Sequence, residues 1–272
     1  MRVCAVQMAH GTQLADNLAR AAAHVARAAQ GGARLALLPE YFFSTFQGPP
    51  VALVEAAPQV RAMMQDASRA HGIAVGGNVI EGAGTPGNEG AKNVGVVYER
   101  GALVLSQPKV HPMPREAASG VVGGAGFGAA TVEGRRAGML VCADILYPEA
   151  ARVLALAGAD ILLNPVMSPW KEKDDGREAR VAMYVARAYD SGAFVVKAAG
   201  FRRPTPGAAP PFGIAGRSLI TAPWGVLARA RDDFEEELLF ADLDFERLAT
   251  FRAGQAQFPP RRPDAYGDLV RP

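Results

Sequence analysis

Three residues of the chain have side chains that together can perform acyl transfer: Cys142, Glu40 and Lys109. A thiol can attack a carbonyl carbon, a carboxylate can accept and return the protons, and an ammonium group can stabilise the oxyanion that forms. Free cysteine has a pKa of about 8.5, so only about 3% is thiolate at neutral pH and the thiol needs a base. These residue types predict nucleophilic catalysis by Cys142 if the fold brings the three together.

Each of the three residues lies where a short apolar segment ends. The segment and residue pairs are 35–38 with Glu40, 103–108 with Lys109, and 138–141 with Cys142. Short apolar runs of this kind predict buried strands. In α/β folds, ligands usually bind outside the carboxyl ends of strands, so each of these positions is one where a binding site is expected.

Taken one at a time, the same residues have ordinary structural interpretations. Cys142 fits a small buried hydrophobic residue, as does Cys4 in the middle of the first apolar run. Glu40 fits a carboxylate at a loop or helix start, and Lys109 fits a solvated surface charge. Their spacing along the chain does not show that the three side chains meet.

The elements that must position these residues alternate between apolar and amphipathic runs. Strands are predicted at residues 3–8, 35–38, 73–80, 94–98, 102–106, 136–142, 161–164, 194–199, 218–220, 225–229 and 238–242. Helices are predicted at 52–71, 148–157 and 178–189, and after a cap at Asp16 or Asn17. This alternation favours an α/β fold. We expect a single domain over residues 1–272, with 251–272 as an extended C-terminal tail.

Composition excludes several classes of partner. The chain has 272 residues, of which 49% are hydrophobic, so it can bury a sizeable core. A formal net charge of +2 gives no electrostatic reason to bind nucleic acid or an anionic membrane. No apolar stretch reaches the roughly 20 residues of a membrane span, and two cysteines make no disulfide framework. We expect a cytoplasmic protein with neither nucleic acid nor membrane as partner.

Cofactor motifs are absent or incomplete. Residues 82–87 match GxGxxG, but Pro86 and the polar residues after it do not favour a helix. A dinucleotide-binding motif needs a helix there, because its N-terminus holds the pyrophosphate. The P-loop and GxSxG patterns do not occur, and the four histidines are scattered without metal-ligand spacing. We expect no cofactor and no metal.

Three sequence blocks resemble the nitrilase superfamily of carbon–nitrogen hydrolases. They are Leu37-Leu38-Pro39-Glu40, Pro108-Lys109-Val110-His111, and the segment from Leu140 to Glu149 that contains Cys142. Their order and their separations of 69 and 33 positions also suit the family. The resemblance implies a four-layer α-β-β-α sandwich that assembles as a homodimer or a higher homo-oligomer.

The resemblance also implies roles for individual residues. Cys142 would be the nucleophile, Glu40 the general base and Lys109 the stabiliser of the oxyanion, with the N–H of Ala143 as second donor. The family often carries a second glutamate near the lysine. Glu116 is the first acidic residue after Lys109, and Glu133 is its rival for this place.

The expected reaction is hydrolysis of a non-peptide C–N bond in a small amide, through a thioester. The alternatives are an N-carbamoyl (ureido) substrate, a nitrile, acyl transfer to an amine or lipid, and a non-catalytic interaction protein. Cys142-Ala143-Asp144 resembles the amidases and carbamoylases, whereas nitrilases tend to carry Trp-Glu after the cysteine. Asp144 also has a structural interpretation, as an acceptor for backbone N–H groups at the turn.

Overall fold

The computed structural model describes residues 1–44, 49–82, 90–171, 173–204, 212–254 and 262–270. Its first sheet has the strand order β14-β1-β2-β3-β4-β5. Strands β1, β2 and β3 are parallel, whereas β4, β5 and β14 join them antiparallel. The bounds are β1 (Arg2–Gln7), β2 (Leu35–Leu37), β3 (Ala74–Gly82), β4 (Ala91–Glu99), β5 (Ala102–Pro108) and β14 (Glu237–Asp242).

The second sheet has the order β13-β12-β10-β8-β7-β6, with β7, β8 and β10 parallel at its centre. Its strands are β6 (Ala129–Val132), β7 (Arg135–Met139), β8 (Ile161–Val166), β10 (Phe194–Ala199), β12 (Leu219–Ala222) and β13 (Gly225–Arg229). A two-stranded sheet pairs β9 (Ser168–Pro169) with β11 (Ile214–Ala215).

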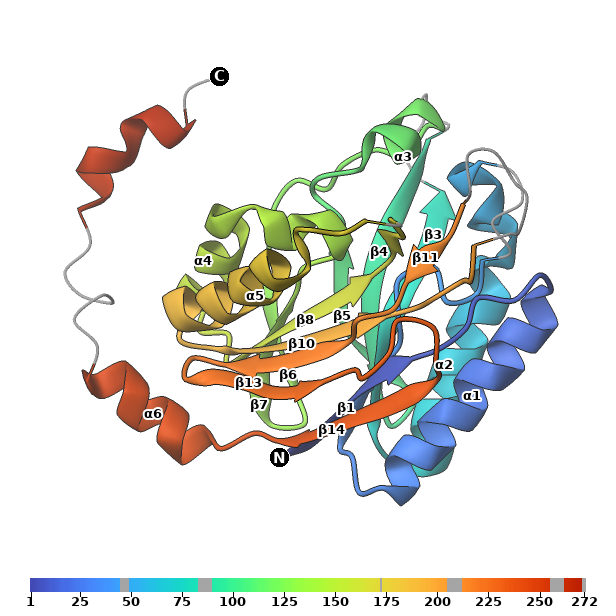
Figure 1. Ribbon diagram of the computed structural model, residues 1–272, viewed down its shortest axis with the longest axis horizontal. Helices are drawn as coiled ribbons and strands as arrows, with labels where there is room; N and C mark the ends of the chain where they lie inside the picture. The colour runs from blue at the N-terminus through green and yellow to red at the C-terminus, as the bar shows by residue number, and fades with distance from the viewer. Residues whose placement is uncertain (45–48, 83–89, 172, 205–211, 255–261, 271–272) are drawn as a thin grey trace.

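Helices cover the outer face of each sheet (Figure 1). Helices α1 (Leu14–Gln30) and α2 (Ala57–His71) lie against the first sheet, and α4 (Pro148–Leu156) and α5 (Arg177–Ser191) against the second. The remaining helices are α3 (Pro114–Ala118), α6 (Phe245–Gly254) and the 3-10 helices η1 (Pro50–Ala56), η2 (Cys142–Leu146) and η3 (Pro263–Val270).

Three apolar clusters separate the four layers. Side chains of a strand alternate between its two faces, so β1 directs Val3 and Ala5 between the sheets and Cys4 and Val6 toward α1 and α2. A third cluster, including Leu154, packs α4 and α5 on the second sheet. The fold is therefore the expected four-layer α-β-β-α sandwich.

The N-terminal start of α1 differs from the prediction. The helix begins at Leu14 after Gln13, so neither Asp16 nor Asn17 caps it. The Asn17 side chain is buried, accepts a hydrogen bond from the Gly11 N–H at 2.7 Å and donates to the carbonyl oxygen of Ser44 at 3.2 Å. Asn17 thus ties the helix to the segment that follows Glu40.

The segment 251–272, predicted as an extended C-terminal tail, contains helical residues. Residues 251–254 complete α6, and 263–270 form η3. Helix α6 forms because Asp244 accepts the N–H of Arg247 at 2.9 Å and because Leu248 is buried against the second sheet's core. Among the helices in the described residues, none is long and apolar enough to cross a membrane.

Candidate active site

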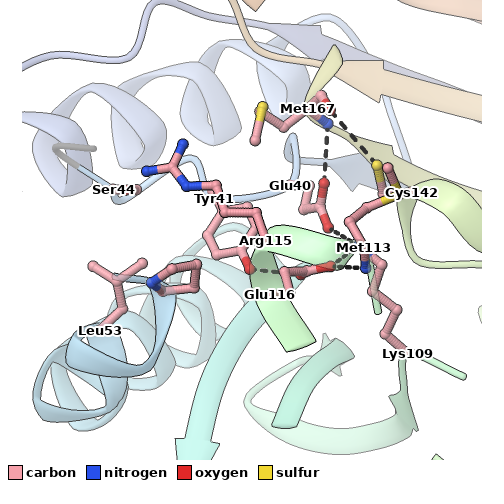
Figure 2. Close-up of a pocket in the computed structure, with 11 residues that line it drawn as sticks. Glu40, Tyr41, Ser44, Leu53, Lys109, Met113, Arg115, Glu116, Cys142 and Met167 are labelled. Atoms are coloured by element: carbon pink, nitrogen blue, oxygen red, sulfur yellow. Dashed lines mark hydrogen bonds and ion pairs between the residues drawn. The ribbon is translucent and has the colours of Figure 1, made fainter. Parts of the chain in front are cut away.

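The ends of three strands meet at one cavity. Glu40 follows β2, Lys109 follows β5, and Cys142 opens η2 shortly after β7. All three line the cavity (Figure 2). The other lining residues are Tyr41, Ser44, Pro50, Leu53, Met113, Arg115, Glu116 and Met167.

The Glu40 carboxylate is buried and held by three donors. Its Oε1 accepts hydrogen bonds from Lys109 Nζ at 2.9 Å and from Asn93 Nδ2 at 2.9 Å. Its Oε2 accepts the backbone N–H of Met167 at 3.1 Å. These contacts fix the carboxylate in one orientation, and Figure 2 shows those with Lys109 and Met167.

The Cys142 thiol lies beside Met167, the residue whose backbone N–H donates to Glu40. Its Sγ is 3.6 Å from the carbonyl oxygen of Met167, whose N–H donates to Glu40. The Cys142 backbone has a φ of 48°, in the left-handed region, where a non-glycine residue is strained. Asn164 donates to the Cys142 carbonyl oxygen at 3.2 Å and so supports this conformation.

Lys109 lies between two carboxylates. Its Nζ is 2.9 Å from Glu40 Oε1 and 2.7 Å from Glu116 Oε2, and the lysine is 1% exposed. The backbone is fixed as well, because Lys109 N–H donates to Asn93 O at 2.7 Å and Lys109 O accepts from Gly124 at 2.8 Å. A Cβ at Gly124 would lie 2.8 Å from Pro108 O, so this close approach requires glycine.

Glu116 on α3 belongs to the site, whereas Glu133 lies elsewhere. Besides Lys109, the Glu116 carboxylate accepts hydrogen bonds from Tyr41 OH at 2.6 Å, Asn93 Nδ2 at 2.8 Å and Met113 N–H at 2.8 Å. Glu133, in the turn between β6 and β7, instead pairs with two arginines, Arg34 and Arg100.

The role of Asn93 and the hydrogen bond from Tyr41 to Glu116 were not predicted from the sequence. Asn93 Nδ2 donates to both Glu40 and Glu116, and its Oδ1 accepts from Asn78 at 2.8 Å. Both asparagines are fully buried in strands that are otherwise largely apolar. Buried amides must be hydrogen-bonded, so polar residues at such positions were the signal that could have found this network.

Asp144 has the structural interpretation that the sequence allowed. Its buried carboxylate accepts backbone N–H groups of Val141 at 3.2 Å, Val110 at 3.3 Å and His111 at 2.9 Å. The side chain therefore ties the segment that carries the cysteine to the segment that carries Lys109. Ala143, between Cys142 and Asp144, is buried within the first turn of η2, where N–H groups have no acceptor inside the helix.

Burial and neighbouring charges shift the pKa of each reactive group. Burial raises the pKa of the Cys142 thiol, and the Glu40 carboxylate raises it further against the opposing effect of Lys109. Burial, with the Glu116 charge, also raises the pKa of Glu40. Burial alone would lower the pKa of Lys109, but the Glu40 and Glu116 charges outweigh it and raise it.

For Glu116, burial opposes ionisation, yet the Lys109 ammonium and several donors hold its pKa below the usual value. Glu116 and Lys109 therefore form a charged pair, whereas Glu40 has a proton affinity above that of an ordinary glutamate. The site places a neutral thiol close to a basic carboxylate and a fixed positive charge. Acyl transfer requires these three groups: a nucleophile, a general base and a stabiliser of the oxyanion. The described residues contain no group of three or more His, Cys, Asp and Glu side chains arranged to hold a metal ion.

Residues 2–253 match the model of the carbon-nitrogen hydrolase family. The chain belongs to this family. It is 28% identical over 286 residues to an N-carbamoylputrescine amidase from Solanum tuberosum, covering 98% of this chain and 94% of that protein. It is 30% identical to a deaminated glutathione amidase from Mus musculus, covering 99% of this chain and 85% of that protein.

A solved structure is similar over almost the whole chain. It is a mutant of the amidase from Nesterenkonia sp. AN1 that shows the result of Michael addition of acrylamide at the active site cysteine. The TM-score is 0.79 at 25% sequence identity, covering 99% of this chain and 100% of that one. Family membership and these relatives identify the protein as a hydrolase of C–N bonds, with Cys-active amidases among its structural neighbours.

Proposed function

We propose that the protein hydrolyses a small amide through a thioester on Cys142, with Glu40 as general base and Lys109 as oxyanion stabiliser. The observation that carries this proposal is the shared contact at Met167, whose N–H holds Glu40 and whose carbonyl oxygen lies 3.6 Å from the thiol. A neutral thiol needs a base at the moment of attack, and Glu40 is the carboxylate held beside it.

In the acylation step, the thiol proton moves first to Glu40 and then to the leaving nitrogen. The Cys142 sulfur forms a bond to the amide carbon while the thiol proton passes to Glu40, and the carbonyl oxygen becomes an oxyanion. The oxyanion faces the Lys109 ammonium and, as second donor, the N–H of Ala143. Glu40 then returns the proton to the amide nitrogen as the C–N bond breaks, leaving ammonia or an amine and a thioester.

Deacylation repeats the sequence with water. Glu40 takes a proton from a water molecule while the water oxygen attacks the thioester carbon. The C–S bond breaks when the oxyanion collapses. The proton returns to the sulfur, which restores the thiol and releases a carboxylic acid. One carboxylate thus serves both half-reactions, which is consistent with its three fixed hydrogen bonds.

Glu116 is assigned as a positioning residue. Its carboxylate offsets the Lys109 charge at 2.7 Å and shares the Asn93 donor with Glu40. Without it, the lysine would have a single buried partner, Glu40, and would bind the base more tightly. Glu116 therefore keeps the lysine in place and the base available.

An N-carbamoyl substrate is the second candidate. The Solanum tuberosum relative is an N-carbamoylputrescine amidase, and this chain matches almost all of it. A ureido group offers the same planar carbonyl and leaving nitrogen to Cys142. We retain the amide as first choice, because no described residue in the cavity singles out a ureido group. The partner in either case is a small molecule, and the cytoplasmic location and the homo-oligomer stay proposals.

A substrate panel tests the function. Amides, ureido acids and nitriles are assayed for ammonia and for carbon dioxide, with wild type and Cys142→Ala side by side. An amide substrate releases ammonia or an amine alone, whereas a carbamoyl substrate releases carbon dioxide as well. The proposal predicts that the best substrate is an amide and that Cys142→Ala is inactive on it. A nitrile as best substrate would contradict the assignment of reaction type.

A further inference from the structure

A second, small pocket lies under α5 on the outer face of the second sheet. It is separate from the cavity of Cys142 and has a different lining. Five of its nine lining residues are cationic: Arg177, Arg180, Lys197, Arg217 and Arg229. They come from α5, β10, the segment before β12, and β13, and in the second sheet β12 lies between β10 and β13.

Lys197 is the buried member of this set. It lies in β10 between Val196 and Ala198, which face the core between the sheets, so the alternation of the strand directs Lys197 toward α5. The residue is 6% exposed, and its Nζ lies 5.1 Å from the centre of the Tyr184 ring. Sequence analysis did not single it out.

The Lys197 ammonium has no carboxylate partner among the described residues. An ammonium group buried without a counter-ion is costly. Burial, with the nearby Arg217 charge, accordingly lowers the pKa of Lys197 to about 7. The lysine lines the cavity, so an anion in the cavity can reach it.

The four arginines share three carboxylates. Arg217 donates to Asp233 at 3.0 and 2.8 Å and also pairs with Asp174. Arg177 shares Asp233 at 3.0 Å, and Arg180 shares Asp174. Arg229 pairs with Glu178 at 2.6 Å. With Lys197 protonated, the lining has two positive charges in excess of these carboxylates.

The shared carboxylates also orient the arginines toward the cavity. Arg217 has a φ of 73°, a strained conformation for a non-glycine residue, and its two bonds to Asp233 hold it there. The Tyr184 ring below Lys197 is fixed because its hydroxyl donates to Asn164 at 2.7 Å. Arg217 and the aromatic ring next to Lys197 are therefore held in place.

We propose that this cavity is a binding site for a small dianion of the phosphate class, inorganic phosphate or a phosphate monoester. A dianion balances the two excess charges and gives Lys197 its missing partner. The planar guanidinium groups suit phosphate oxygens, which arginine binds through two parallel hydrogen bonds. The site does not depend on the reaction proposed for Cys142.

The test measures binding by the intact protein at constant ionic strength, with sodium chloride as the balancing salt. Inorganic phosphate and methyl phosphate are titrated separately by calorimetry, and the melting temperature is recorded at each concentration. We expect saturable binding of at least one dianion at millimolar concentration or below and a rise in Tm of about 5 °C. If only inorganic phosphate binds, the ligand is the free ion. If methyl phosphate binds as well, the site also accepts phosphate monoesters.

Three variants test whether the anion binds at the lining residues of this cavity. Lys197→Met removes the buried charge with little change in volume and should fold at least as stably as wild type, while its affinity falls about tenfold or more. Arg180→Gln should weaken binding similarly. Lys92→Met, on β4 of the first sheet, is the matched control and should bind like wild type. No saturable binding by wild type, or equal binding by Lys197→Met, would overturn the proposal.

Discussion

Glu40 and Lys109 are 69 positions apart in the chain, yet Glu40 Oε1 and Lys109 Nζ lie 2.9 Å apart with both side chains 1% exposed. Burying such a pair is costly unless the remaining polar atoms are also bonded. Here Asn93 Nδ2 and the Met167 N–H donate further hydrogen bonds to the Glu40 carboxylate. Lys109 donates a second hydrogen bond, to Glu116. The network keeps a basic carboxylate and a fixed cation beside the thiol.

The acid side of the pH profile is the first prediction. Burial, with the Glu116 charge, raises the pKa of Glu40 above its usual 4.5. Glu40 must be ionised to take the thiol proton, so kcat/KM of wild type should fall as pH decreases through a pKa above 4.5. The measurement is kcat/KM against pH with a substrate that does not titrate in that range. A profile that stays flat down to pH 4 would contradict the role of Glu40.

Glu116→Gln should move this profile in a defined direction. The Glu116 charge raises the pKa of Glu40, so its removal should shift the acid limb to lower pH. Misplacement of Lys109 should also lower kcat by about 100-fold. Glu133→Gln is the matched control, because Glu133 pairs with Arg34 and Arg100, and it should leave both rate and profile unchanged. A loss of rate in Glu116→Gln with an unshifted profile would indicate a merely structural role.

Lys109→Ala should lose about 100- to 1000-fold in kcat, the usual effect of removing one oxyanion donor. It should also destabilise the fold by about 3–5 kcal/mol, since two buried carboxylates lose their common partner. The double variant Lys109→Met with Glu116→Gln restores the charge balance and should fold like wild type while staying inactive. If the folded double variant kept more than a tenth of wild-type kcat/KM, Lys109 would have no role in the chemistry.

The two cysteines should differ in their reaction with iodoacetamide. Cys142 lines the cavity, whereas Cys4 is fully buried and burial raises the pKa of its thiol to about 12. Native protein should therefore gain one adduct, on the Cys142 peptide, at a rate that increases with pH. Cys4→Ser should label like wild type, and Cys142→Ser should not label until it is unfolded. Equal labelling of both thiols in native protein would contradict the described site.

The candidate residues of the site were predictable because three sequence blocks in order resemble one family. Glu40, Lys109 and Cys142 lie in these blocks. Asn93 and Met167 were not predictable in the same way, since their roles depend on tertiary placement. Asn93 reaches Glu40 only because β4 lies in the same sheet as β2, with β3 between them. Met167 contacts Glu40 across 127 positions of the chain.

The element boundaries show a similar limit. The strands and the four outer helices were largely predicted, because their apolar spacing is local. Helix α6 was missed because its apolar spacing is weak and its stability comes from burial of Leu248 and from ring contacts of Phe245 with Phe194. The helix expected from residue 52 begins as η1 at Pro50 and becomes α-helical only at Ala57. The GxGxxG match at 82–87 lies largely outside the described residues.

The central claim is that Cys142 carries the acyl group while Glu40 serves both half-reactions. Its most direct test is rapid-quench mass spectrometry of wild type, Glu40→Gln and Cys142→Ala with a substrate from the panel, followed by peptide mapping. Wild type should gain the mass of the acyl group on the Cys142 peptide during turnover. Glu40→Gln should accumulate the adduct slowly and release it slowly, and Cys142→Ala should gain none. Turnover by wild type with no adduct at Cys142, together with product formation by Cys142→Ala, would contradict the account.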